Sequence, residues 1–240
     1  MSLLSISSDA KTIKGEKHGY LTGIMYLAPA MVSGRELCPN RSPGCTESCL
    51  FTAGRGRMPQ VMNARINRTK RFHGDRQAFM LSLAYEIEGL CDQARQRGMT
   101  PLVRLNGTSD IPWENVRGGA PGSSIMEWFP EVQFYDYTKS AQRMHKFITT
   151  DVYWPLNYHL TFSRSERNEP ECARILAEGG NVAVVFADAY LPRSWAGAPV
   201  IDGDRSDVRI REGRGLVIGL RAKGRARKDT TGFVVRKKVA

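Results

Sequence analysis

The sequence predicts an α/β fold in the form of a partial, open parallel β/α barrel of about six strands. Short apolar segments rich in β-forming residues alternate with helical segments, a pattern typical of parallel strands joined by helices. Several strands are nearly continuously apolar, which indicates that both faces of the sheet are covered. The 240 residues contain no linker and are enough for one large core. We therefore expect a single domain, 1–240, with strands at 20–27, 101–105, 132–137, 158–162, 181–186 and 215–220.

The remaining segments follow from the same pattern. A polar N-terminal arm, 1–18, precedes the first strand, and a basic C-terminal tail, 221–240, follows the last one. The glycine-rich segment 115–124 is the best candidate for a mobile lid, and 190–208 is expected to be a long loop. No apolar run reaches the roughly 20 residues of a membrane helix, so no membrane contact is expected. Apolar residues at helical spacing predict helices at 58–72, 75–97, 140–149 and 170–177.

A loop with three cysteines follows the first strand. The stretch CPNRSPGCTESCLFTAGRG, residues 38–56, carries Cys38, Cys45 and Cys49, with six and then three residues between them. Its prolines and glycines exclude a regular helix or strand over the first half. Three thiolates in one short loop suit a soft metal or an iron–sulfur cluster. We expect them to hold a [4Fe-4S] cluster whose fourth iron stays open to a small-molecule ligand.

Two other roles for these cysteines stay open at this point. A disulfide is the less favoured, because the chain has five cysteines, an odd number, and no export signal. A structural zinc ion is the stronger rival, with His18 or His73 completing a Cys3His set, although the chain has no CxxC turn. Cys91 lies in the apolar stripe of the second helix and is expected to be a core thiol.

The charge of the chain favours polyanionic partners. The formal net charge is +11 and the pI is about 9.7. One basic cluster runs from Arg55 to Arg76, and another from Arg221 to Lys238. These clusters predict contact with the backbone of a nucleic acid, although a solvated surface and a frayed tail explain the same pattern equally well.

Polar residues follow the carboxyl ends of the predicted strands. Because loops converge at this edge of a parallel β/α array, ligands bind there. Taken singly, Ser109, Asp110 and Ser165 are equally well explained as turn or cap residues. The candidate cofactor-binding residues are Asn106, Thr108, Ser109 and Ser163, and the candidate catalytic residues are Lys139, Asp110 and Arg221. The other residues expected at this rim are Asp136, Tyr137, Thr138, Arg164, Ser165, Asp188 and Lys223.

This arrangement resembles the radical S-adenosylmethionine superfamily of partial β/α barrels. The resemblance lies in the cysteine loop after the first strand and in the turn Asn106-Gly107-Thr108, where that superfamily has a glycine-rich cofactor motif. The superfamily spaces its cysteines CxxxCxxC, whereas the gaps here are longer, and Ser48 stands where an aromatic residue usually precedes the last cysteine. The resemblance implies a [4Fe-4S] cluster on the three cysteines, with S-adenosylmethionine as a candidate ligand of the open iron.

Longer stretches of the sequence are similar to a bacteriophage-encoded family known only by a gene-product number. Besides the cysteine loop, the similarity rests on the runs VRLNGTSDIPWE, FYDYTKS, LTFSRSE, DGDRSDVR and GLVIGLRAKGRARKD, in that order. It covers most of the chain. It implies a viral protein made in the cytoplasm of an infected bacterium, and it assigns no activity.

Three functional hypotheses follow. The first is an iron–sulfur enzyme, either radical-SAM-like or active in sulfur transfer. The second is a nucleic-acid-binding protein that a zinc ion or a cluster stabilises and that grips DNA or RNA through its basic clusters. The third and least favoured is a hydrolytic nuclease with Asp202, Asp204 and Asp207 as Mg²⁺ ligands, because this run of residues is equally well explained as a turn.

Overall fold

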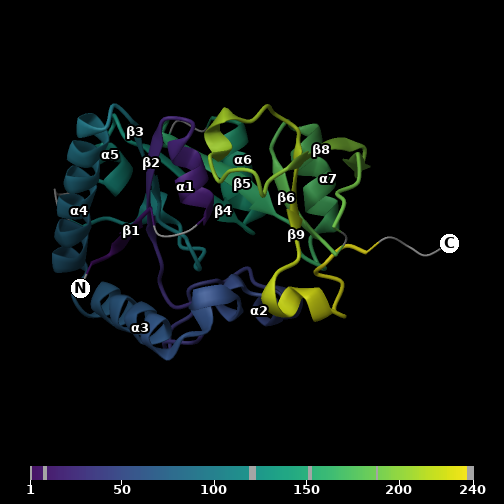
Figure 1. Cartoon of the computed structure of the whole chain (residues 1–240), viewed down its shortest axis with the longest axis horizontal. Helices are drawn as coiled ribbons and strands as arrows, with labels where there is room; N and C mark the ends of the chain where they lie inside the picture. The colour runs from purple at the N-terminus through teal and green to yellow at the C-terminus, as the bar shows by residue number, and fades with distance from the viewer. Residues whose placement is uncertain (1, 8–9, 119–122, 151–152, 188, 237–240) are drawn as a thin grey trace.

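The protein has a mostly parallel, open sheet with helices packed against it (Figure 1). The computed structural model describes residues 2–7, 10–118, 123–150, 153–187 and 189–236. In these ranges, nine strands form one sheet in the order β1-β2-β3-β4-β5-β6-β9-β8-β7. All neighbours are parallel except β1 with β2 and β7 with β8. The strands are β1 (Leu4–Ile6), β2 (Tyr20–Met25), β3 (Thr100–Arg104), β4 (Gln133–Thr138), β5 (Tyr158–Ser163), β6 (Val182–Phe186), β7 (Ser194–Trp195), β8 (Ala198–Asp202) and β9 (Val217–Arg221).

Seven α-helices and five short 3₁₀ helices accompany the sheet in the described part of the chain. The α-helices are α1 (Ala10–Glu16), α2 (Pro43–Glu47), α3 (Pro59–Gly74), α4 (Arg76–Gln96), α5 (Ile125–Trp128), α6 (Ala141–Ile148) and α7 (Glu169–Ala177). The 3₁₀ helices are η1 (Leu50–Thr52), η2 (Gly54–Arg57), η3 (Trp113–Asn115), η4 (Arg209–Arg211) and η5 (Gly224–Lys228). None of these helices is both long and apolar enough to pass through a lipid bilayer.

The six predicted strands and the four predicted helices are confirmed, whereas the strands at the two edges of the sheet were not predicted. The predicted polar arm contributes β1 and α1, and Leu3 and Leu4 are buried there. The predicted loop at 190–208 contains the hairpin β7–β8, which extends the sheet beyond β9. Ala196 and Gly197 both have positive φ, as the two central residues of a tight hairpin turn require. Part of the predicted lid at 115–124, residues 119–122, lies outside the described residues.

The main core lies between one face of the sheet and the helices α4, α6 and α7. On α4, Leu83, Ile87 and Leu90 recur at helical spacing and are fully buried. Each such side chain contributes about 1.5–3 kcal/mol relative to an exposed one. The opposite face carries a smaller cluster, Leu102 with Tyr135 and Val208. The sheet is therefore covered on both faces, as its apolar strands predicted.

The carboxyl ends of the parallel strands open onto one edge of the molecule. The cysteine loop, residues 38–56, follows β2 and lies along this edge together with α3 and the C-terminal segment 222–236, at the bottom of the view in Figure 1. The connections after β3, β4 and β5 reach the same edge, because these strands are parallel to β2. Topology therefore brings the predicted rim residues toward the cysteines.

Candidate functional site

Cys38 lies over the ends of β2 and β3. Its sulfur accepts a hydrogen bond from the Ala30 backbone N–H at 3.4 Å and lies 3.8 Å from the Thr108 carbonyl oxygen. The backbone around it is fixed by two further bonds, from the Leu37 N–H to the Ala30 carbonyl and from the Asp110 N–H to the Leu37 carbonyl. Cys38 is thereby fastened to the connection that follows β3.

The middle of the cysteine loop is clamped between two other parts of the chain. Glu166, after β5, accepts hydrogen bonds from the Ser42 hydroxyl at 2.7 Å and the Gly44 N–H at 2.9 Å. On the other side, a Cβ at Gly44 would lie 2.1 Å from Thr231 Oγ1 and 2.7 Å from Phe233 Cβ. Only glycine fits so close an approach. None of these contacts uses a cysteine sulfur.

The three thiols influence one another electrostatically. Burial, with smaller contributions from the charges of Cys49, Asp110 and Cys45, raises the pKa of Cys38 to about 12, against the lowering effect of the Ala30 N–H. Burial also raises the pKa of Cys49, as does Cys45, whereas Lys139 and Arg65 lower it. Without a metal, Cys38 and Cys49 are therefore neutral thiols at pH 7. A cation among them would favour their thiolate forms.

Arg65 is a buried cation next to Cys49 that the sequence did not single out. It projects inward from α3 with a side chain that is mostly buried, 7% exposed for the whole residue, and its guanidinium lies 5.1 Å from the centre of the Tyr26 ring. Its Nε and Nη1 atoms have no hydrogen-bond partner among the described residues. Arg65 belongs to the basic cluster from Arg55 to Arg76 that was predicted to contact a nucleic acid, and its buried side chain is a correction to that prediction. A buried guanidinium with unmade hydrogen bonds is costly unless an anion joins it.

Lys139 and Ser163 reach the same neighbourhood from β4 and β5. The Lys139 Nζ atom donates a hydrogen bond to Ser163 Oγ at 2.7 Å and lies 5.6 Å from the centre of the Phe233 ring. Its charge favours the thiolate of Cys49. Thr108 is close to Cys38 through its carbonyl, but its hydroxyl bonds to the Leu27 carbonyl at 2.6 Å. Lys139, Ser163 and Thr108 thus lie near the cysteine loop, as predicted.

Asn106, Ser109 and Asp110 lie beside the site, where they hold each other and the loop after β3 in place. The side-chain oxygen of Asn106 accepts bonds from the Ser109 hydroxyl, the Ile111 N–H and the Trp113 indole. Its amide donates to Asp136 and to the Ile111 carbonyl. These groups are already occupied, which favours a supporting role over direct contact with a ligand.

Arg143 is a second buried cation that sequence reasoning missed. It bonds to Asp110 at 2.8 Å, to both carboxylate oxygens of Glu114 at 2.7 and 2.9 Å, and to the Tyr158 hydroxyl at 3.1 Å. Asp110 also accepts the Lys139 N–H at 2.9 Å. Arg143 therefore orients Asp110, which in turn fixes the backbone of Lys139. No motif marked it, since it is one basic residue in a short amphipathic helix.

Arg221, a candidate catalytic residue, is held by two carboxylates. Its guanidinium bonds to Asp202 at 2.9 Å and to Asp204 at 3.4 Å, so it ties β9 to the end of β8. Asp207, the third acidic residue of the nuclease hypothesis, instead contacts Arg104 at 2.9 Å and the Tyr135 hydroxyl at 3.1 Å. Asp202 and Asp204 therefore share one cation, Arg221, whereas Asp207 engages another cation and a phenol. Asp188, predicted at the rim, lies outside the described residues.

The histidines considered for a zinc site are not near all three thiols. His18 precedes β2 and lies at the opposite end of that strand, roughly 16 Å away for a six-residue strand. His73 lies in the last turn of α3, against Phe72. Within the described ranges, no three His, Cys, Asp or Glu side chains come together closely enough to hold one metal ion.

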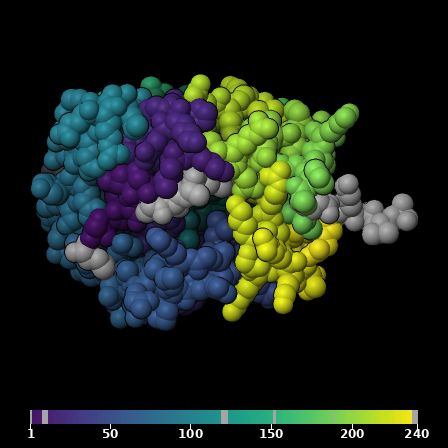
Figure 2. All heavy atoms as spheres, viewed as in Figure 1, coloured from purple at the N-terminus to yellow at the C-terminus, as the bar shows by residue number. Residues whose placement is uncertain are grey.

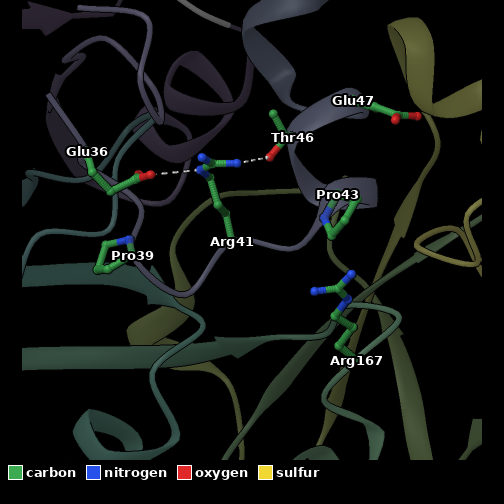
Figure 3. A pocket seen from close by; sticks show the side chains of 7 residues that line it. All are labelled: Glu36, Pro39, Arg41, Pro43, Thr46, Glu47 and Arg167. Carbon is green, nitrogen blue, oxygen red and sulfur yellow. Dashed lines mark hydrogen bonds and ion pairs between the residues drawn. The ribbon is translucent and has the colours of Figure 1, made fainter. Parts of the chain in front are cut away.

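A hollow of about 440 Å³ lies on the outer side of the cysteine loop (Figure 3). Arg41 crosses it and bonds to Glu36 at 3.0 Å and to Thr46 at 3.1 Å. Arg167 points toward it from the connection after β5 (Figure 3). The sulfurs do not line this hollow, so it is a surface feature beside the thiols. Its remaining lining residues are Pro39, Pro43 and Glu47.

Fold and site together define a mostly parallel α/β protein with a cysteine-rich loop fixed at the carboxyl edge of its sheet. The profile of the family described as Gene product 88 matches residues 2–237, and the chain belongs to this family. The match agrees with the similarity of the sequence to a numbered phage gene product. No curated protein and no solved structure matches the chain.

Proposed function

We propose that this protein is an iron–sulfur protein in which Cys38, Cys45 and Cys49 hold a [4Fe-4S] cluster with one open iron. The observation that carries the proposal is Arg65, whose buried guanidinium lies near Cys49 with two nitrogen atoms unpartnered among the described residues. Three thiolates outweigh the two positive charges of an oxidised [4Fe-4S] core, so the assembled centre is an anion. Arg65 is placed to offset that charge.

The arrangement of the thiols does not suit a single zinc ion. Sulfurs bound to a single zinc at about 2.3 Å must lie within roughly 4 Å of one another. The charge of Cys45 raises the pKa of both Cys38 and Cys49, yet within the described residues no three ligand side chains surround one metal position. A centre with several irons bridges a wider gap between its ligands.

In this proposal, Lys139 would bind a ligand of the open iron. Its ammonium group bonds only to Ser163 Oγ among the hydrogen bonds in the described ranges, so two donors stay available. An ammonium group beside a metal centre suits the carboxylate of a bidentate amino-acid ligand, and S-adenosylmethionine carries such a group. When bound, the cluster supplies one electron at a time. Lys139 and Ser163 would orient the ligand beside it.

The test is the metal content of anaerobically purified protein. We expect a brown protein with about four irons and four sulfides per chain. Replacing Cys38, Cys45 or Cys49 with alanine should remove most of the iron, whereas Cys91→Ala, the matched control on α4, should leave it unchanged. Colourless protein with one zinc per chain, or iron retained in all three variants, would refute the proposal.

A second assay addresses the ligand of the open iron. Reduced protein is incubated with S-adenosylmethionine, and 5′-deoxyadenosine is measured. Lys139→Met should raise the concentration of S-adenosylmethionine needed for half-maximal cleavage while the iron content is maintained. If wild-type protein with a full cluster neither binds nor cleaves this cofactor, S-adenosylmethionine is ruled out as the ligand, and sulfur transfer or a structural role of the cluster takes its place.

A further inference from the structure

The two basic clusters of the sequence meet in space. η1 and η2 continue from the cysteine loop, and η1 packs against η5, which follows β9 (Figure 2, blue and yellow). A Cβ at Gly224 would lie 2.8 Å from Ala53 Cβ, so the two segments are in close contact. Residues about 170 positions apart in the chain thereby form one surface.

This surface carries cations that the fold does not use. Arg55, Arg57, Arg225 and Lys228 are exposed, and within the described residues their side chains make no ion pair or hydrogen bond. We call these four residues the cationic ridge. The only acidic residue in 50–57 and 223–236 is Asp229, which is buried and accepts hydrogen bonds from Thr231 and Val234. The ridge is therefore not neutralised from within its own segments.

The ridge adjoins the thiols. Cys49 immediately precedes η1, and Cys45 packs against a small apolar cluster that includes Ala226 of η5 and Phe233. Leu50 and Met58, 58% and 51% exposed, lie in the same stretch as Arg55 and Arg57. Surfaces for single strands combine cations that contact phosphates with side chains, usually aromatic, on which bases stack. Here the exposed apolar side chains beside the cations are aliphatic.

We infer that the cationic ridge docks a single-stranded nucleic acid and that a nucleotide of this strand is the substrate presented to the cluster. Only the second part of this inference, that a nucleotide is presented to the cluster, rests on the proposed function. A duplex fits less well, because the cysteines are recessed and a base must leave its stack to reach them. A membrane surface is less suited, because these cations lie on short 3₁₀ turns and not along one face of an amphipathic helix.

The experiment measures binding of fluorescein-labelled single strands of about 20 nucleotides, RNA and DNA, by anisotropy at several salt concentrations. The ridge variant replaces Arg55, Arg57, Arg225 and Lys228 with glutamine. The control variant replaces four exposed cations at the opposite end of the β-strands with glutamine. It therefore has the same net charge as the ridge variant. The control positions are Lys17, Arg97, Lys146 and Arg211.

We expect wild type and control to bind with a steep salt dependence, and the ridge variant to bind weakly. Removing one cation that contacts a phosphate should reduce the slope of log K against log salt by about 0.7. The inference would be overturned if strand affinity fell equally in both variants or if the wild type bound duplex more tightly than single strands. Binding to phosphatidylserine vesicles but not to strands would also overturn it. Iron is measured on the same samples. Wild-type protein that holds iron but binds no strand refutes only the ridge, and wild-type protein that binds strands but holds no iron refutes only the cluster.

Discussion

Replacing Arg65 with methionine should change the metal-free and the cluster-loaded protein in opposite directions. Methionine has a similar length and no charge, so it keeps most of the packing of α3 while removing the buried guanidinium. In metal-free protein the cation faces neutral thiols and has two nitrogens without a partner among the described residues. In loaded protein it would face an anion. The substitution should therefore stabilise the metal-free protein and weaken the binding of the cluster in the loaded protein.

The magnitude for the metal-free state follows from two opposing contributions. A buried polar group without a partner costs about 1–3 kcal/mol. Its contact with the Tyr26 ring, at 5.1 Å, offsets about 1 kcal/mol of this cost. The net gain on removing Arg65 is about 1 kcal/mol. For a chain of 240 residues this raises the melting temperature of metal-free protein by about 2–4 °C.

The assay pairs thermal unfolding of metal-free protein with iron retention and reduction potential of the loaded form. Loss of a nearby positive charge should lower the potential and speed the loss of iron. Lys70→Met removes one charge at an exposed position on the same helix. Because this charge is not buried beside the thiols, the substitution should change none of the three quantities. If Arg65→Met destabilises the metal-free protein and leaves the potential unchanged, Arg65 has an ordinary structural role and the charge argument fails.

Three further predictions concern residues of the cysteine loop and the contacts around it. Gly44→Ala should lower the unfolding free energy by about 1–3 kcal/mol in a urea titration and reduce iron content, since its Cβ meets Thr231 Oγ1 at 2.1 Å, whereas Gly89→Ala on α4 should not destabilise. Arg143→Ala should cost about 3–5 kcal/mol in the same titration, because it leaves carboxylates buried without their cation. The Cys38 thiol has a raised pKa in the folded state, so its contribution to the stability of metal-free protein is full below pH 9.0 and lost as pH rises toward 12. Cys38→Ala should flatten that pH dependence, and an unchanged slope would contradict it.

The sequence predicted the centre of the sheet well and its edges poorly. β2 to β6 and β9 are apolar segments flanked by turn residues, so their periodicity is strong. β1 has three residues and β7 has two, too few for any periodicity. The prolines and glycines between 190 and 208 predicted only a loop, yet the pair Ala196 and Gly197 is where the hairpin turns.

At the site, the sequence predicted which strand ends lie together. It did not predict which hydrogen-bond partners the polar side chains have. Parallel strands bring their carboxyl ends together, so the proximity of Lys139 and Ser163 to the cysteine loop followed from the strand assignments. Which polar side chains are already engaged depends on contacts between distant residues. Asn106 and Asp110 look like ligand-binding residues in the sequence, and only the bonds to Asp136 and Arg143 reveal a supporting role. The inward orientation of Arg65 likewise depends on how α3 is seated.

The cysteine loop is held in place by contacts that do not involve its sulfurs. Glu166 binds the backbone of α2, Gly44 packs against the C-terminal segment, and the Asp110 N–H binds the carbonyl of Leu37. These bonds exist with neutral thiols. In zinc fingers the metal supplies the folding free energy. Here the folded loop would precede the metal, because its position is fixed by the sheet edge and by two other connections. Binding the cluster would then require only that thiols already in position lose their protons. The affinity for iron should therefore rise with pH while the fold stays unchanged.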